Sequence, residues 1–245
     1  MRARWISTFA ILVSVAAALP AFAQLSPSAT WAAQAGAQYQ VNANLTYRTA
    51  SNQQLKMDVY YRRGVTTPQP TLVYMHGGFW VAGVKETAIP ALMPWFEMGW
   101  NVVNVEYRLG AATDPKTLAP SAVDDCFCAL RFIAALPANF NIDRDRIVVT
   151  GESAGGHLAL SMGIIPESAG IGRECAGAAA PPAPGGGRGG APAAPAAPAP
   201  VSLPPVPQVA AVINWFGITD GADVIDGTHR RAAAGRWFGT MPDRL

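Results

Sequence analysis

The sequence has little charge and few cysteines or histidines, and these shortages limit what the protein can be. Its 245 residues contain 18 Lys and Arg against 16 Asp and Glu, a formal net charge of +2. Two of the basic residues, Arg2 and Arg4, lie in an N-terminal segment that we expect to be removed, which leaves the charges balanced. Because no basic field then remains, nucleic acid is not an expected partner.

The apolar run near the N-terminus is short for a membrane span. Residues 5–19 are mostly apolar, follow Arg2 and Arg4, and precede the small-residue tripeptide Ala21-Phe22-Ala23. This order is typical of a secretory signal peptide, whereas a membrane-spanning helix needs about 20 apolar residues. We therefore expect residues 1–23 to be a cleaved signal peptide, with no stable membrane span afterwards and a periplasmic or secreted mature chain.

Three cysteines in an exported protein allow one disulfide and leave one thiol over. Cys126 and Cys128 are two residues apart on an expected helix, so their side chains point in different directions. Cys175 is therefore the expected partner of one of them, and the sequence does not say which.

Short β-rich runs alternate with helical segments, a pattern that predicts an α/β protein whose sheet is mostly parallel. The hydrophobic content of 50% is sufficient for one domain, which we place at residues 24–245. A polar turn at 51–53 predicts a hairpin, and an apolar segment predicts a helix with Pro94 in its first turn. The expected strands are 44–48, 55–61, 71–75, 101–105, 146–150 and 209–216, and the expected helices are 91–98 and 122–136.

Residues 176–207 differ in composition from the rest of the chain. They are rich in Ala, Pro and Gly and contain few side chains that could fill a core. We interpret them as a linker-like insertion on the surface of the domain. A binding role for the proline runs is the alternative.

The clearest chemical motif is Gly151-Glu152-Ser153-Ala154-Gly155, which lies between a β-rich run and an apolar helical segment. Glycines on both sides of the serine allow a sharp turn between strand and helix, so that the hydroxyl stands exposed. The N-terminus of the helix also favours developing negative charge. This context predicts that Ser153 is a catalytic nucleophile.

A second motif, His76-Gly77-Gly78, follows the expected strand 71–75 directly. Adjacent glycines can turn backbone N–H groups toward one point, where they would stabilise the negative charge of an acyl-transfer transition state. The N–H groups of Gly77 and Gly78, together with that of Ala154, are therefore the predicted oxyanion hole.

The segments HGGFW (76–80), VEYRL (105–109) and GESAGGHLAL (151–160) occur in the order found in a known family. The sequence resembles hormone-sensitive-lipase-type and feruloyl-esterase-like carboxylesterases of the α/β-hydrolase superfamily, from about residue 47 to about residue 239. The resemblance implies hydrolysis of small-molecule carboxylic esters through an acyl-enzyme, with no metal and no organic cofactor. It also implies a structural role for Tyr107, Arg108 and Leu109. Many members have three glycines after the histidine, and here Phe79 stands in the third place.

The catalytic acid and base of this family are missing from these residues. In the family they follow the serine, after the last strands of the sheet, and we expect them in sequence beyond Leu245. One side of the core should then be uncovered. The three histidines present are poor candidates for the base: His76 should fix the oxyanion loop, His157 should pack, and His229 should be solvated in a segment that resembles a lid.

Several other polar and aromatic residues have competing interpretations. Asp124 and Asp125 suit the start of a helix. Three later acids should cap a helix or line the lid: Asp220, Asp223 and Asp226. Four aromatic residues follow strand ends and could contact substrate or pack in the core: Phe79, Trp80, Trp215 and Phe216.

Two other functions compete with ester hydrolysis. A peptidase of the prolyl-oligopeptidase type uses the same serine turn, and a non-catalytic binding protein could keep the fold after losing its base. The identity of the ester, the length of its acyl chain and the oligomeric state are left open by the sequence.

Export gives the first testable prediction. Mass spectrometry of material recovered outside the cytoplasm should find a mature N-terminus near Gln24, because a peptidase cuts after small residues such as Ala23. An exported protein that retains Met1 would contradict the signal-peptide assignment.

Overall fold

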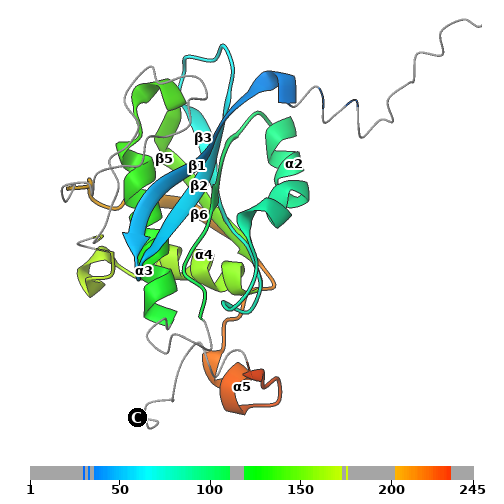
Figure 1. Ribbon diagram of the computed structural model, residues 1–245, viewed down its shortest axis with the longest axis vertical. Helices are drawn as coiled ribbons and strands as arrows, with labels where there is room; N and C mark the ends of the chain where they lie inside the picture. Colours follow the sequence, from blue (N-terminus) through cyan, green and yellow to red (C-terminus); the bar gives the residue numbers. More distant parts are fainter. Residues whose placement is uncertain are drawn as a thin grey trace, which may run out of the picture.

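The computed structural model describes residues 30, 33, 36–110, 119–172, 175 and 202–232. The predicted signal peptide and most of the predicted insertion lie outside the described residues. Figure 1 shows a central sheet with helix α2 (Ile89–Glu97) on one side and helix α3 (Ala119–Ala135) on the other.

Within the described ranges, six strands form one mixed sheet in the order β1-β2-β4-β3-β5-β6. Strands β1 and β2 form an antiparallel hairpin, β2 is antiparallel to β4, and β4, β3, β5 and β6 are mutually parallel. The predicted α/β class with a mostly parallel sheet is thus confirmed. The strands are β1 (Tyr39–Ala50), β2 (Gln53–Arg62), β3 (Gln69–Met75), β4 (Asn101–Val105), β5 (Ile142–Glu152) and β6 (Val209–Trp215).

Helices α2, α3 and α4 lie in the connections between parallel strands, as such pairing requires, and α5 follows β6. Both predicted helices form, but Pro94 lies in the interior of α2 rather than in its first turn, where Pro90 stands instead. None of the helices among the described residues has the length and apolar character needed to cross a membrane. The helices are α2 (Ile89–Glu97), α3 (Ala119–Ala135), α4 (Ala154–Ile164) and α5 (Gly221–Asp226), with short 3-10 turns η1 (Lys85–Ala88), η2 (Ala138–Phe140) and η3 (Glu167–Ala169).

The two faces of the sheet have separate apolar cores. Residues of α3 and α4, such as Phe132 and Leu158, pack on one face, and residues of α2, such as Leu92 and Phe96, pack on the other. Leu203 and Val206, at the end of the predicted insertion, are partly buried against the α3–α4 core. The final residues of that segment therefore belong to the packed domain.

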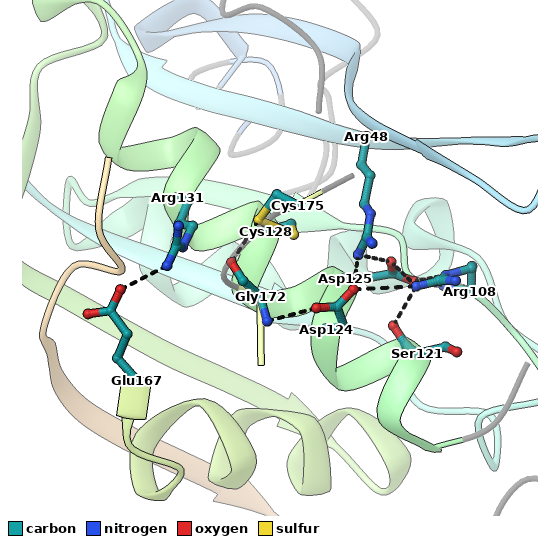
Figure 2. The surroundings of a disulfide bond; sticks show 10 residues. All are labelled: Arg48, Arg108, Ser121, Asp124, Asp125, Cys128, Arg131, Glu167, Gly172 and Cys175. Carbon is teal, nitrogen blue, oxygen red and sulfur yellow. Dashed lines mark hydrogen bonds and ion pairs between the residues drawn. A yellow bond between two sulfur atoms is a disulfide. The ribbon is translucent and has the colours of Figure 1, made fainter. Parts of the chain in front are cut away.

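A buried ion-pair network fastens helix α3 to the sheet (Figure 2). The carboxylate of Asp125 is fully buried and accepts two hydrogen bonds from the Arg108 guanidinium, each 2.8 Å long. It also accepts the Arg108 backbone N–H at 2.9 Å and the Arg48 guanidinium at 2.8 Å. Asp124 pairs with Arg48 as well. Asp124 and Asp125 do not lie at the start of α3, which begins at Ala119, so their predicted place in the first turn of the helix is wrong. Their structural role comes instead from the ion pairs with Arg48 and Arg108.

The disulfide joins Cys128 of α3 to Cys175, and Cys126 is the buried free cysteine (Figure 2). This settles which cysteine of the pair 126 and 128 bonds Cys175. The bridge closes a loop of 47 residues that contains β5, Ser153 and all of α4. Close to it, the backbone N–H of Gly172 donates to Asp124 at 2.7 Å. The segment that leaves α4 is thereby held against α3.

Replacing Cys128 and Cys175 with alanine should lower the free energy of unfolding by about 4 kcal/mol, because a loop of this length gains much entropy when it is opened in the unfolded chain. Urea unfolding under non-reducing conditions measures the change. Cys126→Ala is the matched control, since it leaves the bridge intact. An equal loss in the control would show that the bridge is not the source of the effect.

Candidate active site

Ser153 occupies a strained turn between β5 and α4. Its backbone has φ 51° and ψ −116°, a region that costs a non-glycine residue about 1–3 kcal/mol. The turn is held by two backbone hydrogen bonds: Ser153 donates to the Trp215 carbonyl at 2.9 Å, and its own carbonyl accepts from His157 at 3.1 Å. The residue is half-buried and lies where β5 ends and α4 begins, at the end of the sheet.

Glycines make this turn possible by removing side chains where backbones meet. A Cβ atom built on Gly155 would lie 2.0 Å from the Met75 carbonyl oxygen and 2.7 Å from that of His76. A Cβ on Gly151 would lie 2.5 Å from the same Met75 oxygen. The first turn of α4 is therefore packed directly against the end of β3, and no larger residue fits there.

The His76-Gly77-Gly78 loop begins where β3 ends and lies beside the serine turn. A Cβ on Gly77 would come within 3.1 Å of the Glu152 carbonyl oxygen, one residue before Ser153. Gly78 has φ 123°, and its carbonyl accepts the N–H groups of Val81 and Ala82 at 3.1 and 3.0 Å. The structure thus brings the two predicted motifs into contact.

His76 and Tyr107 fix the backbone of this loop. The rings of these two residues stack with centroids 4.6 Å apart, and the Tyr107 hydroxyl donates to the His76 carbonyl at 2.8 Å. His76 Nδ1 lies 2.7 Å from the Gly77 carbonyl oxygen. Because a carbonyl oxygen can only accept a hydrogen bond, Nδ1 carries the proton. The peptide between Gly77 and Gly78 is trans, so the Gly78 N–H points away from the His76 ring, opposite to the Gly77 carbonyl. Burial lowers the pKa of His76, with the contact to the Gly77 carbonyl acting in the other direction.

Ala154 is the first residue of α4 and is fully buried. The first N–H groups of a helix have no partner within the helix and carry its positive dipole end. The N–H groups of Gly77, Gly78 and Ala154 therefore come from two segments in contact with each other. Their role as an oxyanion hole remains a prediction.

Sequence reasoning missed two residues that support the loop. Gly83 has φ 104°, and a Cβ there would lie 2.4 Å from His76 Nδ1, so only glycine allows the histidine ring its place. The hydrogen bond from the Tyr107 hydroxyl to the His76 carbonyl was not predicted either, since the resemblance implies only a general structural role for Tyr107. A lone glycine a few residues after HGGFW was the available signal.

His157 packs rather than points to solvent. Its ring meets that of Trp80 edge to face, with centroids 5.2 Å apart, and Trp80 is fully buried. Burial lowers the pKa of His157 from its ordinary value of 6.5 to about 4. The imidazole is therefore neutral at pH 7, in line with the expected packing role.

His229 is exposed and pairs with a carboxylate beyond the end of β6. Its Nδ1 lies 2.6 Å from Asp223 Oδ2, and the hydrogen bond to His229 lowers the pKa of Asp223. Asp220 caps α5 by accepting the Asp223 N–H at 3.1 Å. The expected helix cap is thus present, and the aspartate–histidine pair links α5 (Gly221–Asp226) to the residues that follow it.

The four aromatic residues near the strand ends separate into two kinds. Trp80 belongs to the core, whereas Phe79, Trp215 and Phe216 are 37%, 54% and 74% exposed. Phe79 and Trp80 both have positive φ values, of 51° and 58°, a region that residues other than glycine rarely adopt. Within the described ranges, no cluster of three or more His, Cys, Asp or Glu side chains could hold a metal ion.

A strand, a strained serine and a helix at the end of a mostly parallel sheet define an α/β-hydrolase. Residues 57–183, just over half of the chain, match the family model described as BD-FAE, and the chain belongs to that family. It is also similar to carboxylesterase NlhH of Mycobacterium tuberculosis, at 34% identity over 114 residues. That match covers 46% of this chain and 34% of the relative.

Two further proteins extend the comparison. Human hormone-sensitive lipase is 27% identical over 123 residues, which are 49% of this chain and 11% of the lipase. A solved structure of esterase 2 from Thermogutta terrifontis, phosphoramylated by tabun, superposes with a TM-score of 0.55 at 20% identity. That superposition covers 84% of this chain and 63% of the esterase, and at this identity it shows the fold alone. The match spans about a third of the length of NlhH.

The low pKa of His157 makes stability depend on pH. Between pH 6.5 and about 4 the unfolded chain binds a proton at this residue and the folded protein does not. The contribution of neutral His157 to the free energy of unfolding is therefore fully present above pH 6.5. It is lost as the pH falls toward 4, by up to about 3 kcal/mol. Urea unfolding at pH 7 and pH 4 should show a smaller pH-dependent loss for His157→Phe than for the wild type. Equal losses would mean that His157 is not protected from protonation.

Proposed function

We propose that this protein hydrolyses small-molecule carboxylic esters, with Ser153 as nucleophile and an acyl-enzyme as intermediate. The observation that carries the proposal is the strained conformation of Ser153 directly beside the Gly77-Gly78 loop. Strain of this kind at a half-buried hydroxyl is typical of a functional residue rather than of a folding requirement. The carboxylesterase relatives support the same reaction class.

In the proposed reaction the Ser153 oxygen attacks the ester carbonyl and loses its proton to a base. The negative charge that develops on the former carbonyl oxygen is stabilised by the N–H groups of Gly77, Gly78 and Ala154, and losing one such donor typically costs about 3 kcal/mol. The tetrahedral intermediate expels the alcohol, which takes the proton from the base. Water then attacks the acyl-enzyme by the same route and releases the carboxylic acid.

We propose that the base is a histidine and its partner an acid, both in polypeptide beyond Leu245. Within the described part of the chain, each histidine has another environment: His76 supports the loop, His157 packs on Trp80, and His229 pairs with Asp223 on the exposed α5 segment. Without a base Ser153 stays a protonated, weak nucleophile, although an oxyanion hole and binding alone can retain roughly 10³-fold catalysis over water. We also propose that the protein acts outside the cytoplasm, where its disulfide is stable.

The competing function is a binding protein that keeps the fold without catalysis. It is favoured by the same observation that leaves Ser153 without a described base. An activated serine reacts with a fluorophosphonate and an idle serine does not. This reagent therefore separates the two functions.

The gene product that continues past Leu245 should react with a fluorophosphonate at Ser153, whereas the 245-residue chain alone should react very slowly. Intact-mass measurement and peptide mapping identify the labelled residue. Ser153→Ala should abolish labelling and turnover of short p-nitrophenyl esters, and Ser161→Ala, in the helix that follows Ser153, should preserve both.

Two outcomes would contradict the proposal. A longer product that folds but does not label would favour the binding protein. Robust Ser153-dependent turnover by the 245-residue chain would mean that one of its own histidines is the base, and His229→Ala would identify it.

A further inference from the structure

Glu152 directly precedes Ser153, and its carboxylate lies against the glycine loop. A Cβ atom built on Gly77 would lie 3.2 Å from Glu152 Cγ and 3.5 Å from Glu152 Oε1. Glu152 is exposed, and the ion pairs among the described residues all involve other carboxylates. A negative charge without an ion-pair partner in the described part of the chain therefore lies beside the predicted oxyanion hole.

The charge of Glu152 acts on two side chains at the end of β3. Burial raises the pKa of Tyr74 to about 12, and the negative charge of Glu152 acts in the same direction. Burial lowers the pKa of His76, and the charge of Glu152 is among the effects that oppose this shift. Tyr74 and His76 flank the last residue of β3, so the carboxylate acts where this strand leads into the glycine loop.

A carboxylate in this place opposes the proposed reaction of a neutral ester. The reaction builds a second negative charge on the former carbonyl oxygen, and two like charges a few ångströms apart repel each other. A substrate that carries a positive group close to its carbonyl neutralises the carboxylate and removes this opposition. The position of Glu152 therefore favours cationic esters over neutral and anionic ones.

Glu152 also lines a hollow whose other walls suit a cation. The hollow has a volume of about 420 Å³, and Trp215, whose carbonyl accepts the Ser153 N–H, lies at its border. Trp215 is 54% and Phe216 is 74% exposed. The faces of aromatic rings attract ammonium groups, and aromatic cages bind quaternary ammonium ligands. The aromatic lining residues are Tyr74, Trp95, Trp215 and Phe216.

We propose that Glu152 selects the charge of the substrate, so that the esters cleaved at Ser153 carry an ammonium group held between the Glu152 carboxylate and the aromatic rings of the hollow. This inference rests on the proposed function, which it extends from esters in general to cationic esters. Glu152 contacts the charged group of the substrate and takes no part in making or breaking bonds.

Matched pairs of esters test the charge preference in the natural gene product in its full length. One pair is the acetate ester of choline and its uncharged isostere, in which a quaternary carbon replaces the nitrogen. The other pair places the same groups on the acyl side, in methyl esters of trimethylammoniobutanoate and of its carbon isostere. In at least one pair kcat/KM should be roughly tenfold higher for the cationic ester, the size of one close charge contact near a surface. Ratios near one in both pairs would overturn the proposal.

Variants assign the preference to Glu152. Glu152→Gln removes the charge at nearly constant shape and should bring the ratio close to one, whereas Glu152→Asp should retain part of the preference. Because the ratio compares two esters on the same variant, a general loss of activity or stability cancels. Asp145→Asn, at an exposed residue near the other end of β5, removes the same charge and should leave the ratio as in the wild type. An unchanged ratio in Glu152→Gln, or an equal fall in Asp145→Asn, would contradict the role of Glu152.

Binding without turnover separates this inference from the proposed function. In the Ser153→Ala variant, titration with phenyltrimethylammonium, followed by tryptophan fluorescence, should show saturable binding that Glu152→Gln weakens roughly tenfold. Such binding in a protein without esterase activity would leave the cation site correct and the catalytic proposal wrong. Ser153-dependent hydrolysis of neutral esters, with no preference for cationic esters and no binding of phenyltrimethylammonium, would do the reverse.

Discussion

The contact between Gly155 and the end of β3 is the constraint on which the rest of the site depends. Helix α4 can begin beneath Ser153 only because its first turn has no side chain toward the carbonyls of Met75 and His76. That approach forces Ser153 into a backbone conformation that side chains normally avoid, and the strain is offset by the packing of α4 against the sheet. The same contact sets the glycine loop after His76 beside the nucleophile, so one close approach positions both halves of the proposed chemistry.

A second set of interactions keeps this arrangement rigid at a distance from the serine. Asp125 is buried with Arg48 and Arg108, and its charge is compensated by hydrogen bonds from both guanidinium groups and from the backbone. Removing one partner of such a buried pair typically costs about 3–5 kcal/mol, because the remaining charge is left without compensation. Together with the Cys128–Cys175 bridge, which encloses the serine turn in its loop, the network ties α3 to both sides of the candidate active site.

Much of this could be read from the sequence where a local pattern decides the structure. The strand at 101–105, the serine turn and the loop at Gly77 and Gly78 follow from β-rich runs and paired glycines, and the structure has them at those residues. Other features depend on distant contacts and could not be read in this way. The choice of Cys128 over Cys126 depends on the path of the segment after α4, and the burial of Trp80 depends on a core that includes distant residues and on the contact with His157. The interior position of Pro94 was misjudged because the helix begins at Ile89, before the apolar segment that signalled it.

The most direct test of the account is to trap the covalent intermediate. The natural gene product in its full length should be mixed with a p-nitrophenyl ester, quenched in acid within the first turnover, digested and analysed by mass spectrometry. The account predicts one acyl group on the peptide that contains Ser153, formed together with a burst of p-nitrophenol, and its absence in Ser153→Ala. Rapid ester turnover with no acyl group on Ser153, or with the acyl group on another residue, would contradict the assignment of the nucleophile.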